Sequence, residues 1–381
     1  MSSVFPPDSP FLGAFGSLIA NPETPVVTLD FPYNINPAYV TTAGTVNGGS
    51  VTQANSQAVF QTGTNAAGAA VLESLISARY SPGQGQMGRF TFGFAAPRAN
   101  SRQLVGIGTS TDGYFFGFVN TTFGMVRRQN GTDFFTAQSA FNGPDQFLGF
   151  DPSFGNVYEI EYQWLGYGAI RGWIENPATG LPGLVNTINY TNSNVLPSVF
   201  NPNLPIRIEL VNAGNTTSLS AFCASAGIYC QGPFNSSGAR FSVGNRKTAI
   251  GAETSIFALQ NKATFQGKTN RGRIHIDSIG SAISGGSDSQ YRMVLNPTLG
   301  GAPSFTDINT TQSIAAFDVA GTTVTGGTEI RRGPTVGNFQ LQEEVSQLQI
   351  RLNPSDLLVM AAGSFAGNVA PNLSLSWTEE L

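Results

Sequence analysis

Histidine and cysteine are scarce in this sequence, and their scarcity excludes whole classes of chemistry. His275 is the only histidine and no Gly-x-Ser-x-Gly motif occurs, so a Ser/His/Asp catalytic triad lacks the residues it requires. Two cysteines, Cys223 and Cys230, are too few for a zinc site. We therefore expect no catalytic residue, no metal ion and no cofactor. His275 alternates with isoleucines in RIHID, and we expect it to pair with a carboxylate at the surface.

Cys223 and Cys230 lie close together in the stretch AFCASAGIYCQGP. They fit either two small buried thiols or a local disulfide that closes a tight loop. A disulfide requires Cα atoms within about 4.4–6.8 Å of each other. We favour the free thiols.

Charged residues are also scarce, at 11% of the chain against roughly 25% in soluble domains. The formal net charge is −4 and Lys and Arg form no long run. This argues against a nucleic-acid partner, because binding of that kind depends on neutralising phosphates. Arg127-Arg128 is an isolated basic pair, which we expect to be solvated on a hairpin.

Long apolar runs are missing as well. No window approaches 18 uncharged apolar residues, so we expect no membrane span. The opening MSSVFPPDSPFLG has neither a basic nor a sustained apolar region, and we expect no secretory signal.

Aromatic residues and glycine, in contrast, are abundant. The chain has 381 residues with 28 Phe and 10 Tyr, which supply ample core, and its 45 Gly and 22 Pro predict frequent turns and few long helices.

Residues 1–40 differ from the rest because prolines recur every few positions: Pro6, Pro7, Pro10, Pro22, Pro25, Pro32 and Pro37. Proline fixes φ and removes a backbone donor, so this segment predicts an extended arm. Aromatic side chains between the prolines are its candidate anchoring points on a neighbouring subunit: Phe5, Phe11, Phe15, Phe31 and Tyr33.

From about residue 50 the hydrophobic pattern has a period of two. Alternate aromatics share one face in RFTFGFA (89–95) and in GYFFGFV (113–119). Asn130-Gly131 stands between two apolar runs and favours a type I′ hairpin turn. Turn signals recur about every ten residues, which is typical of an antiparallel sandwich.

The stretch 158–180, YEIEYQWLGYGAIRGWIENPATG, reads as a hairpin within a sheet. Its first strand is expected to turn the aromatic positions 158, 162 and 164 toward the core, with Glu159 and Glu161 on the opposite, solvated face. Residues 165–168 supply the reversal, and AIRGWIE is the returning strand.

The second half continues with strand-like segments such as RIHID, YRMVL, LLVMAAG and LSLSW. Residues 347–352 fit a helix or a strand, and we favour the strand. The sequence therefore predicts an all-β protein: an extended arm over 1–40, a first jelly-roll or lectin-like antiparallel β-sandwich over 41–235, and a second sandwich over 236–381.

Two patterns bear on sugar chemistry. Glu159 and Glu161 share a strand face, and laminarinase-like hydrolases carry Glu-x-Asp-x-(x)-Glu on such a strand. Here the middle Asp is Glu and the last Glu is missing, so two solvated glutamates are the favoured interpretation. Trp173, Tyr167 and Arg171 are candidate glycan contacts, because aromatic rings stack on sugars.

Several long strings resemble uncharacterised structural-type proteins of tailed phages and giant DNA viruses. They include ARYSPGQGQMGRFTFGF (78–94), NVYEIEYQWLGYGAIRGWIENPATG (156–180) and KATFQGKTNRGRIHIDSI (262–279). The resemblance covers most of residues 70–381, excludes the arm and carries no catalytic residue. It implies a virion component without naming a position in the particle. We expect a structural protein and not an enzyme, such as a minor capsid, decoration, vertex or fibre protein.

Such a protein would act through assembly with itself, as a symmetric homo-oligomer such as a trimer, and with other virion proteins. The alternative is a carbohydrate-binding attachment protein that recognises host glycans, and a third hypothesis is a glycoside hydrolase.

Overall fold

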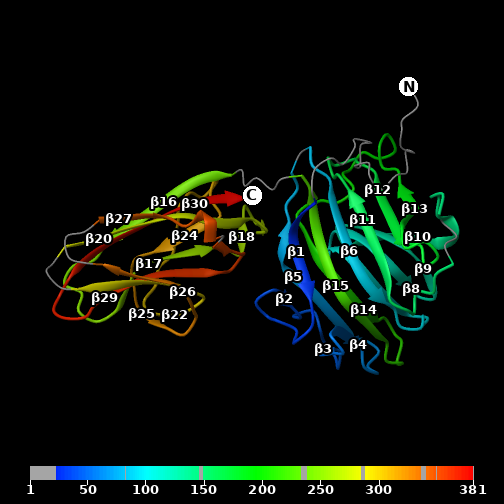
Figure 1. Ribbon diagram of the computed structural model, residues 1–381, viewed down its shortest axis with the longest axis horizontal. Coiled ribbons are helices and arrows are strands. Elements are labelled where there is room, and N and C mark those ends of the chain that lie inside the picture. Colours follow the sequence, from blue (N-terminus) through cyan, green and yellow to red (C-terminus); the bar gives the residue numbers. More distant parts are fainter. Residues whose placement is uncertain are drawn as a thin grey trace. The chain divides into compact units, whose positions relative to one another are not determined.

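The protein is all-β. In the computed structural model the described residues are 23–81, 83–145, 149–232, 238–284, 288–335, 340–348 and 350–380. The chain divides into two compact units, residues 1–234 and residues 235–381 (Figure 1). Each unit contains two large antiparallel sheets.

The first unit contains an eight-stranded and a seven-stranded sheet. The eight-stranded sheet runs β13 (Pro182–Ile188), β12 (Ile170–Glu175), β11 (Asn156–Tyr162), β6 (Gln86–Gly93), β15 (Ser220–Gln231), β4 (Gln57–Gln61) and β3 (Ser50–Ala54), with β1 (Glu23–Asp30) also on β15. The seven-stranded sheet runs β10 (Thr132–Ala137), β9 (Thr122–Gln129), β8 (Gly113–Val119), β7 (Ser101–Gly108), β14 (Leu204–Asn212), β5 (Ala69–Ala78) and β2 (Val40–Thr41). The 3₁₀ helix η1 (Gln138–Ala140) follows β10.

A single aromatic-rich core joins these two sheets. Tyr158 of β11 lies 5.5 Å from Phe116 of β8, and Tyr162 lies 5.0 Å from Tyr114, measured between ring centroids. The alternating aromatics predicted to share a face are buried here: Phe90, Phe92, Phe94, Tyr114, Phe116 and Phe118. The period-two pattern therefore identified the inner faces of β6 and β8 correctly.

The second unit has a five-stranded and a six-stranded sheet around a second core. The five-stranded sheet runs β16 (Ala239–Arg246), β30 (Ala370–Glu380), β20 (Arg273–Ser284) and β27 (Gln340–Glu344), with β28 (Arg351–Leu352) also on β20. The six-stranded sheet runs β23 (Thr306–Asp307), β24 (Ala315–Asp318), β17 (Thr254–Asn261), β29 (Leu357–Ser364), β21 (Ser289–Leu295) and β26 (Thr328–Thr335). Two small ribbons pair β18 (Thr264–Phe265) with β19 (Lys268–Thr269) and β22 (Thr298–Gly301) with β25 (Gly321–Thr325).

The predicted N-terminal arm is partly wrong. Residues 23–30 form β1, which pairs with β15 of the same chain, and Val27, Leu29 and Phe31 lie in the first core. The alternating pattern of PVVTLDF forms a strand despite the prolines around it. One proline at a strand position costs less free energy than the burial of three apolar side chains contributes. Tyr33 is 90% exposed, whereas Phe5, Phe11 and Phe15 lie outside the described residues.

The predicted strand over 347–352 is also wrong in part. The chain forms the 3₁₀ helix η2 (Ser346–Leu348) before β28. Both β27 and β28 pair with β20, on either side of a bulge between Ile276 and Ser278. The short helix takes up the extra residues that this change of register leaves unpaired.

The two cysteines lie on one strand and are both free. Cys223 and Cys230 are buried on β15, and a bulge between Cys223 and Ser225 turns both side chains toward the core. Seven residues of extended chain separate the thiols by roughly 20 Å. This exceeds the reach of a disulfide, so the favoured interpretation is correct.

Candidate functional site

The outer face of the eight-stranded sheet carries two carboxylates from β11. Successive side chains of a strand point to opposite faces, and Tyr158, Ile160 and Tyr162 point into the core. Glu159 and Glu161 therefore point outward, as expected. They are not solvated, however: Glu159 is 6% exposed and Glu161 is 3% exposed.

Glu159 pairs with an arginine from the neighbouring strand. Arg89 of β6 lies directly opposite Glu159 in the register, and its Nε donates a hydrogen bond of 2.6 Å to Glu159 Oε1. The same guanidinium lies 4.0 Å from Glu23 and 5.7 Å from the centre of the Tyr229 ring. Burial raises the pKa of Glu159, although Arg89 opposes the rise.

Glu161 is held by three side chains. Gln231 Nε2 donates a hydrogen bond of 2.9 Å to Glu161 Oε1, and the indole N–H of Trp173 donates another. Arg171, opposite Glu161 on β12, places Nη1 3.8 Å from Oε2. Burial raises the pKa of Glu161 despite these partners. A carboxyl group with a pKa raised by burial beside a specific cation is a common mark of a functional site.

The sequence candidates for glycan contact are divided between two places. Trp173 and Arg171 lie together beside Glu161, but Trp173 is only 3% exposed, so its ring is a buried support of the carboxylate. Tyr167 lies in the loop after β11, 40% exposed, with its ring stacked 6.3 Å from that of Tyr190. Its hydroxyl donates to the Val195 carbonyl at 3.0 Å.

Sequence reasoning missed Arg89 and Gln231 as members of this site. They stand 70 residues before Glu159 and 70 residues after Glu161 and belong to no motif. Their only signal is alternation, which places each on the outer face of its own strand. Alternation does not reveal which strands become neighbours.

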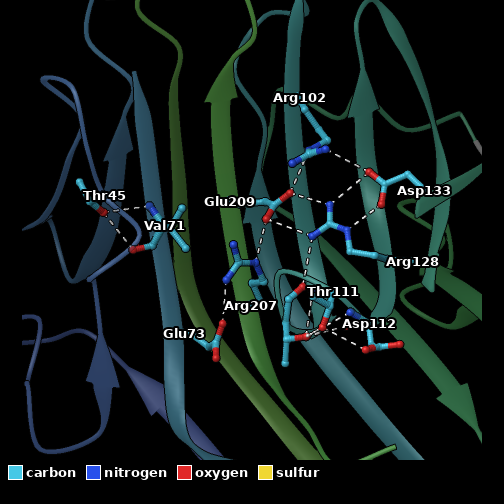
Figure 2. Close-up of polar contacts among 11 residues, drawn as sticks. Thr45, Val71, Glu73, Arg102, Thr111, Asp112, Arg128, Asp133, Arg207 and Glu209 are labelled. Atoms are coloured by element: carbon cyan, nitrogen blue, oxygen red, sulfur yellow. Dashed lines mark hydrogen bonds and ion pairs between the residues drawn. The ribbon is translucent and has the colours of Figure 1, made fainter. Parts of the chain in front are cut away.

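The outer face of the seven-stranded sheet carries a second polar cluster, an ion-pair network centred on Glu209 of β14 (Figure 2). Arg128 donates to Glu209 at 2.8 and 3.2 Å and to Asp133 at 2.6 and 3.2 Å. Arg207 donates to Glu209 at 2.7 Å, and Arg102 Nε forms an ion pair with it at 2.9 Å. Three guanidinium groups therefore surround one carboxylate.

This network shows that the predicted solvation of Arg127-Arg128 is wrong. Arg127 is 7% and Arg128 is 2% exposed. Burial alone would raise the pKa of Glu209, but the bonds and charges of Arg128, Arg102 and Arg207 hold it at about 2. The partners are so fully engaged with one another that the cluster serves the fold rather than a ligand.

The remaining candidate of the sequence is the single histidine. His275 Nε2 lies 2.9 Å from Glu380 Oε2, as expected of a paired histidine, although the imidazole is half-buried. Among the described residues, no three His, Cys, Asp or Glu side chains are grouped to hold a metal ion. Within the same residues no helix is long and apolar enough to cross a membrane.

No protein-family model and no curated protein matches the chain. Among solved structures, it is similar to the carbohydrate recognition domain of Emp47p (12% identity, TM-score 0.36, covering 54% of this chain and 96% of that chain). It is also similar to the CBM2 module of the evolved Dit of Lactobacillus casei BL23 phage J-1 (13%, 0.36, 56% and 98%). A putative beta-glucanase from Mycobacterium abscessus is similar to the same extent (11%, 0.38, 54% and 99%). Likenesses this distant assign neither a family nor a ligand.

Proposed function

We propose that the protein binds carbohydrate through the outer face of the eight-stranded sheet, at the side chains around Glu161. The observation that supports this is a buried carboxylate that holds half-buried polar side chains in fixed positions on the sheet face. Glu161 is itself only 3% exposed, but it binds Gln231 and Arg171, which a ligand can reach. Sugar hydroxyls can form hydrogen bonds with both of these side chains.

Half-buried side chains surround the two carboxylates and offer a ligand further contacts. Arg89 retains 40% and Arg171 17% of its side-chain surface, and Tyr229 and Gln231 are also half-buried. Two guanidinium groups, an amide and an aromatic ring are the groups that fix the orientation of a polar ligand in a binding site.

Glycan hydrolysis is the second candidate function, and one observation favours it. Glu159 and Glu161 stand two positions apart on one strand face, and burial raises the pKa of both. A glycosidase needs one protonated and one ionised carboxyl group at its scissile bond. Gln163, at the third position of the laminarinase-like pattern, supplies no further acid.

A glycan array followed by calorimetric titration of the best ligand tests binding. We expect Glu161→Gln to weaken binding about tenfold, because Glu161 positions Arg171 and Gln231, and a hydrogen bond to a charged group contributes about 1.5–3 kcal/mol. Glu73→Gln, which makes the same change on the opposite sheet of the first unit, should leave affinity unchanged. Equal affinities for wild type and Glu161→Gln would refute the proposal.

Turnover of the bound glycan would distinguish hydrolysis from binding alone. Loss of product formation in Glu159→Gln with binding retained would establish it. The virion role implied by the sequence resemblance stays a prediction, which detection of the protein within intact particles would test.

A further inference from the structure

The outer face of the five-stranded sheet in the second unit carries a groove of about 640 Å³. Small-molecule sites typically enclose about 300–1,000 Å³. Strands β16, β30, β20 and β27, which contribute to its lining, are neighbours in that order in the sheet (Figure 1). Its polar lining includes Arg240, Ser242, Ser278, Glu344, Ser346 and Ser376.

The floor of this groove is a row of hydroxyl groups set by strand register. Ser242 pairs with Ser376, Ser376 pairs with Ser278, and Ser278 pairs with Glu344. The row therefore crosses four adjacent strands, with three hydroxyls followed by a carboxylate. The pattern LSLSW on β30 produces it, because Leu375 and the other alternate positions point into the core.

Most polar side chains of the groove have no side-chain partner among the described residues, and Asp277 is the exception, since its Oδ2 accepts a hydrogen bond of 2.7 Å from Thr378. Among the described residues, the Arg240 guanidinium, the Glu344 carboxylate and the serine hydroxyls of the lining form no hydrogen bond or ion pair with another side chain. Arg292 of the same unit, in contrast, pairs with both Glu253 and Glu329. The groove therefore brings together polar side chains that are available to bind a ligand.

The chemistry of the lining selects the class of ligand. A serine hydroxyl both donates and accepts hydrogen bonds, a guanidinium only donates and a carboxylate only accepts. Asp277 and Glu344 outnumber Arg240 in the groove, which disfavours phosphate-bearing ligands. A neutral polyhydroxylated molecule matches all of these groups.

We propose that this groove is a second saccharide-binding site, whose hydroxyl row and Glu344 receive the hydroxyl groups of a sugar while Arg240 donates to its oxygens. The site lies in the second unit and shares no residue with the face around Glu161. It stands whether or not that face binds carbohydrate.

Saturation-transfer NMR on the full chain tests this site. The probes are the methyl glycosides of glucose, galactose, mannose and N-acetylglucosamine, each at millimolar concentration. We expect at least one probe to bind wild type, and Ser376→Val, which fills the middle of the row, to weaken it about tenfold. Glu344→Gln should weaken the same probe.

Ser374→Val is the matched control, because Ser374 lies two positions along the same strand on the same face, outside the lining of the groove. It should bind as wild type does, and thermal melts of all variants verify folding. The proposal is overturned if no probe binds, or if Ser376→Val binds as tightly as wild type. Binding lost in Glu161→Gln but unchanged in Ser376→Val would overturn this site and support the other.

Discussion

The guanidinium of Arg128 on β9 reaches Glu209 on β14 across two intervening strands of the seven-stranded sheet, with hydrogen bonds of 2.8 and 3.2 Å. Glycine residues on the two intervening strands make this contact possible. Arg128 stands opposite Gly113 on β8, and Gly113 stands opposite Gly108 on β7. Neither position has a side chain to block the arginine, and a Cβ at Gly113 would lie 2.5 Å from the backbone of Gly108.

Replacing Glu209 should be strongly destabilising. Glu209→Gln leaves three guanidinium groups beside a neutral amide, and loss of one partner of a buried ion pair costs about 3–5 kcal/mol. Urea unfolding at pH 7 measures this. Glu344→Gln, at an exposed position with no partner among the described residues, should change the free energy of unfolding by less than about 0.5 kcal/mol. Similar values for the two variants would contradict a central role of the network.

The titration of Glu209 should account for part of the loss of stability of the protein in acid. The pKa of Glu209 is about 2 in the folded protein, against an ordinary value of 4.5. Its stabilisation is therefore complete above about pH 4.5 and is lost as the pH falls toward 2. Unfolding free energies measured across this window should fall more steeply for wild type than for Glu209→Gln. Parallel curves would show that Glu209 does not titrate with folding.

The titration of Glu161 should change the stability of the protein with pH in the opposite direction to that of Glu209. Its pKa is raised in the folded protein, so the stability that it affects is greatest below its ordinary pKa and is lost as the pH rises through the raised value. Glu161→Gln mimics the protonated acid, so its stability relative to wild type should increase as the pH rises through the raised pKa of Glu161. Thermal melts at a series of pH values measure the difference. A difference that does not change with pH would rule out this titration.

Two tryptophans should differ in their contribution to stability. Trp377 is fully buried in the second core, and Trp377→Ala should cost about 3–5 kcal/mol. Trp164 lies beyond the end of β11 and is only half-buried, with its Nε1 donating to Val199 O at 3.1 Å. Trp164→Ala should therefore cost less. Urea unfolding of both variants, followed by circular dichroism, measures the two losses of stability. A larger loss for Trp164→Ala than for Trp377→Ala would show that the assignment of the cores is wrong.

Deletion of residues 1–35 should destabilise the first unit. The deletion removes β1 and with it three core side chains, Val27, Leu29 and Phe31, and exposes one edge of β15. We expect a lower unfolding temperature and a changed near-ultraviolet dichroism signal. A truncated chain as stable as the full one would mean that β1 adds little to the core. Sedimentation of the full chain tests the predicted homo-oligomer separately.

Local patterns in the sequence were reliable where the structure depends on local geometry. Asn130 and Gly131 have φ values of 47° and 80°, as the predicted type I′ hairpin requires. The alternation of β11 gave the correct inner face. Leu165 and Gly166, with φ values of 42° and 80°, form the predicted reversal after it.

The candidate site was predictable only in part, because its environment is built from distant segments. The outward direction of Glu159 and Glu161 followed from alternation, but their burial did not. Arg89 and Gln231 reach them from strands 70 residues away, and no feature of the local sequence indicates that pairing. The partners of Arg128 were missed for the same reason, since Glu209 lies 81 residues further along the chain.

The placement of the two thiols on one strand prevents them from forming a disulfide with each other. Cys223 and Cys230 point into the same core roughly 20 Å apart, so an oxidant cannot join them without unravelling β15. Burial raises the pKa of the Cys223 thiol to about 12, which keeps it in the unreactive protonated form. The described fold is therefore complete with both thiols reduced, and no disulfide between them can form within the folded chain.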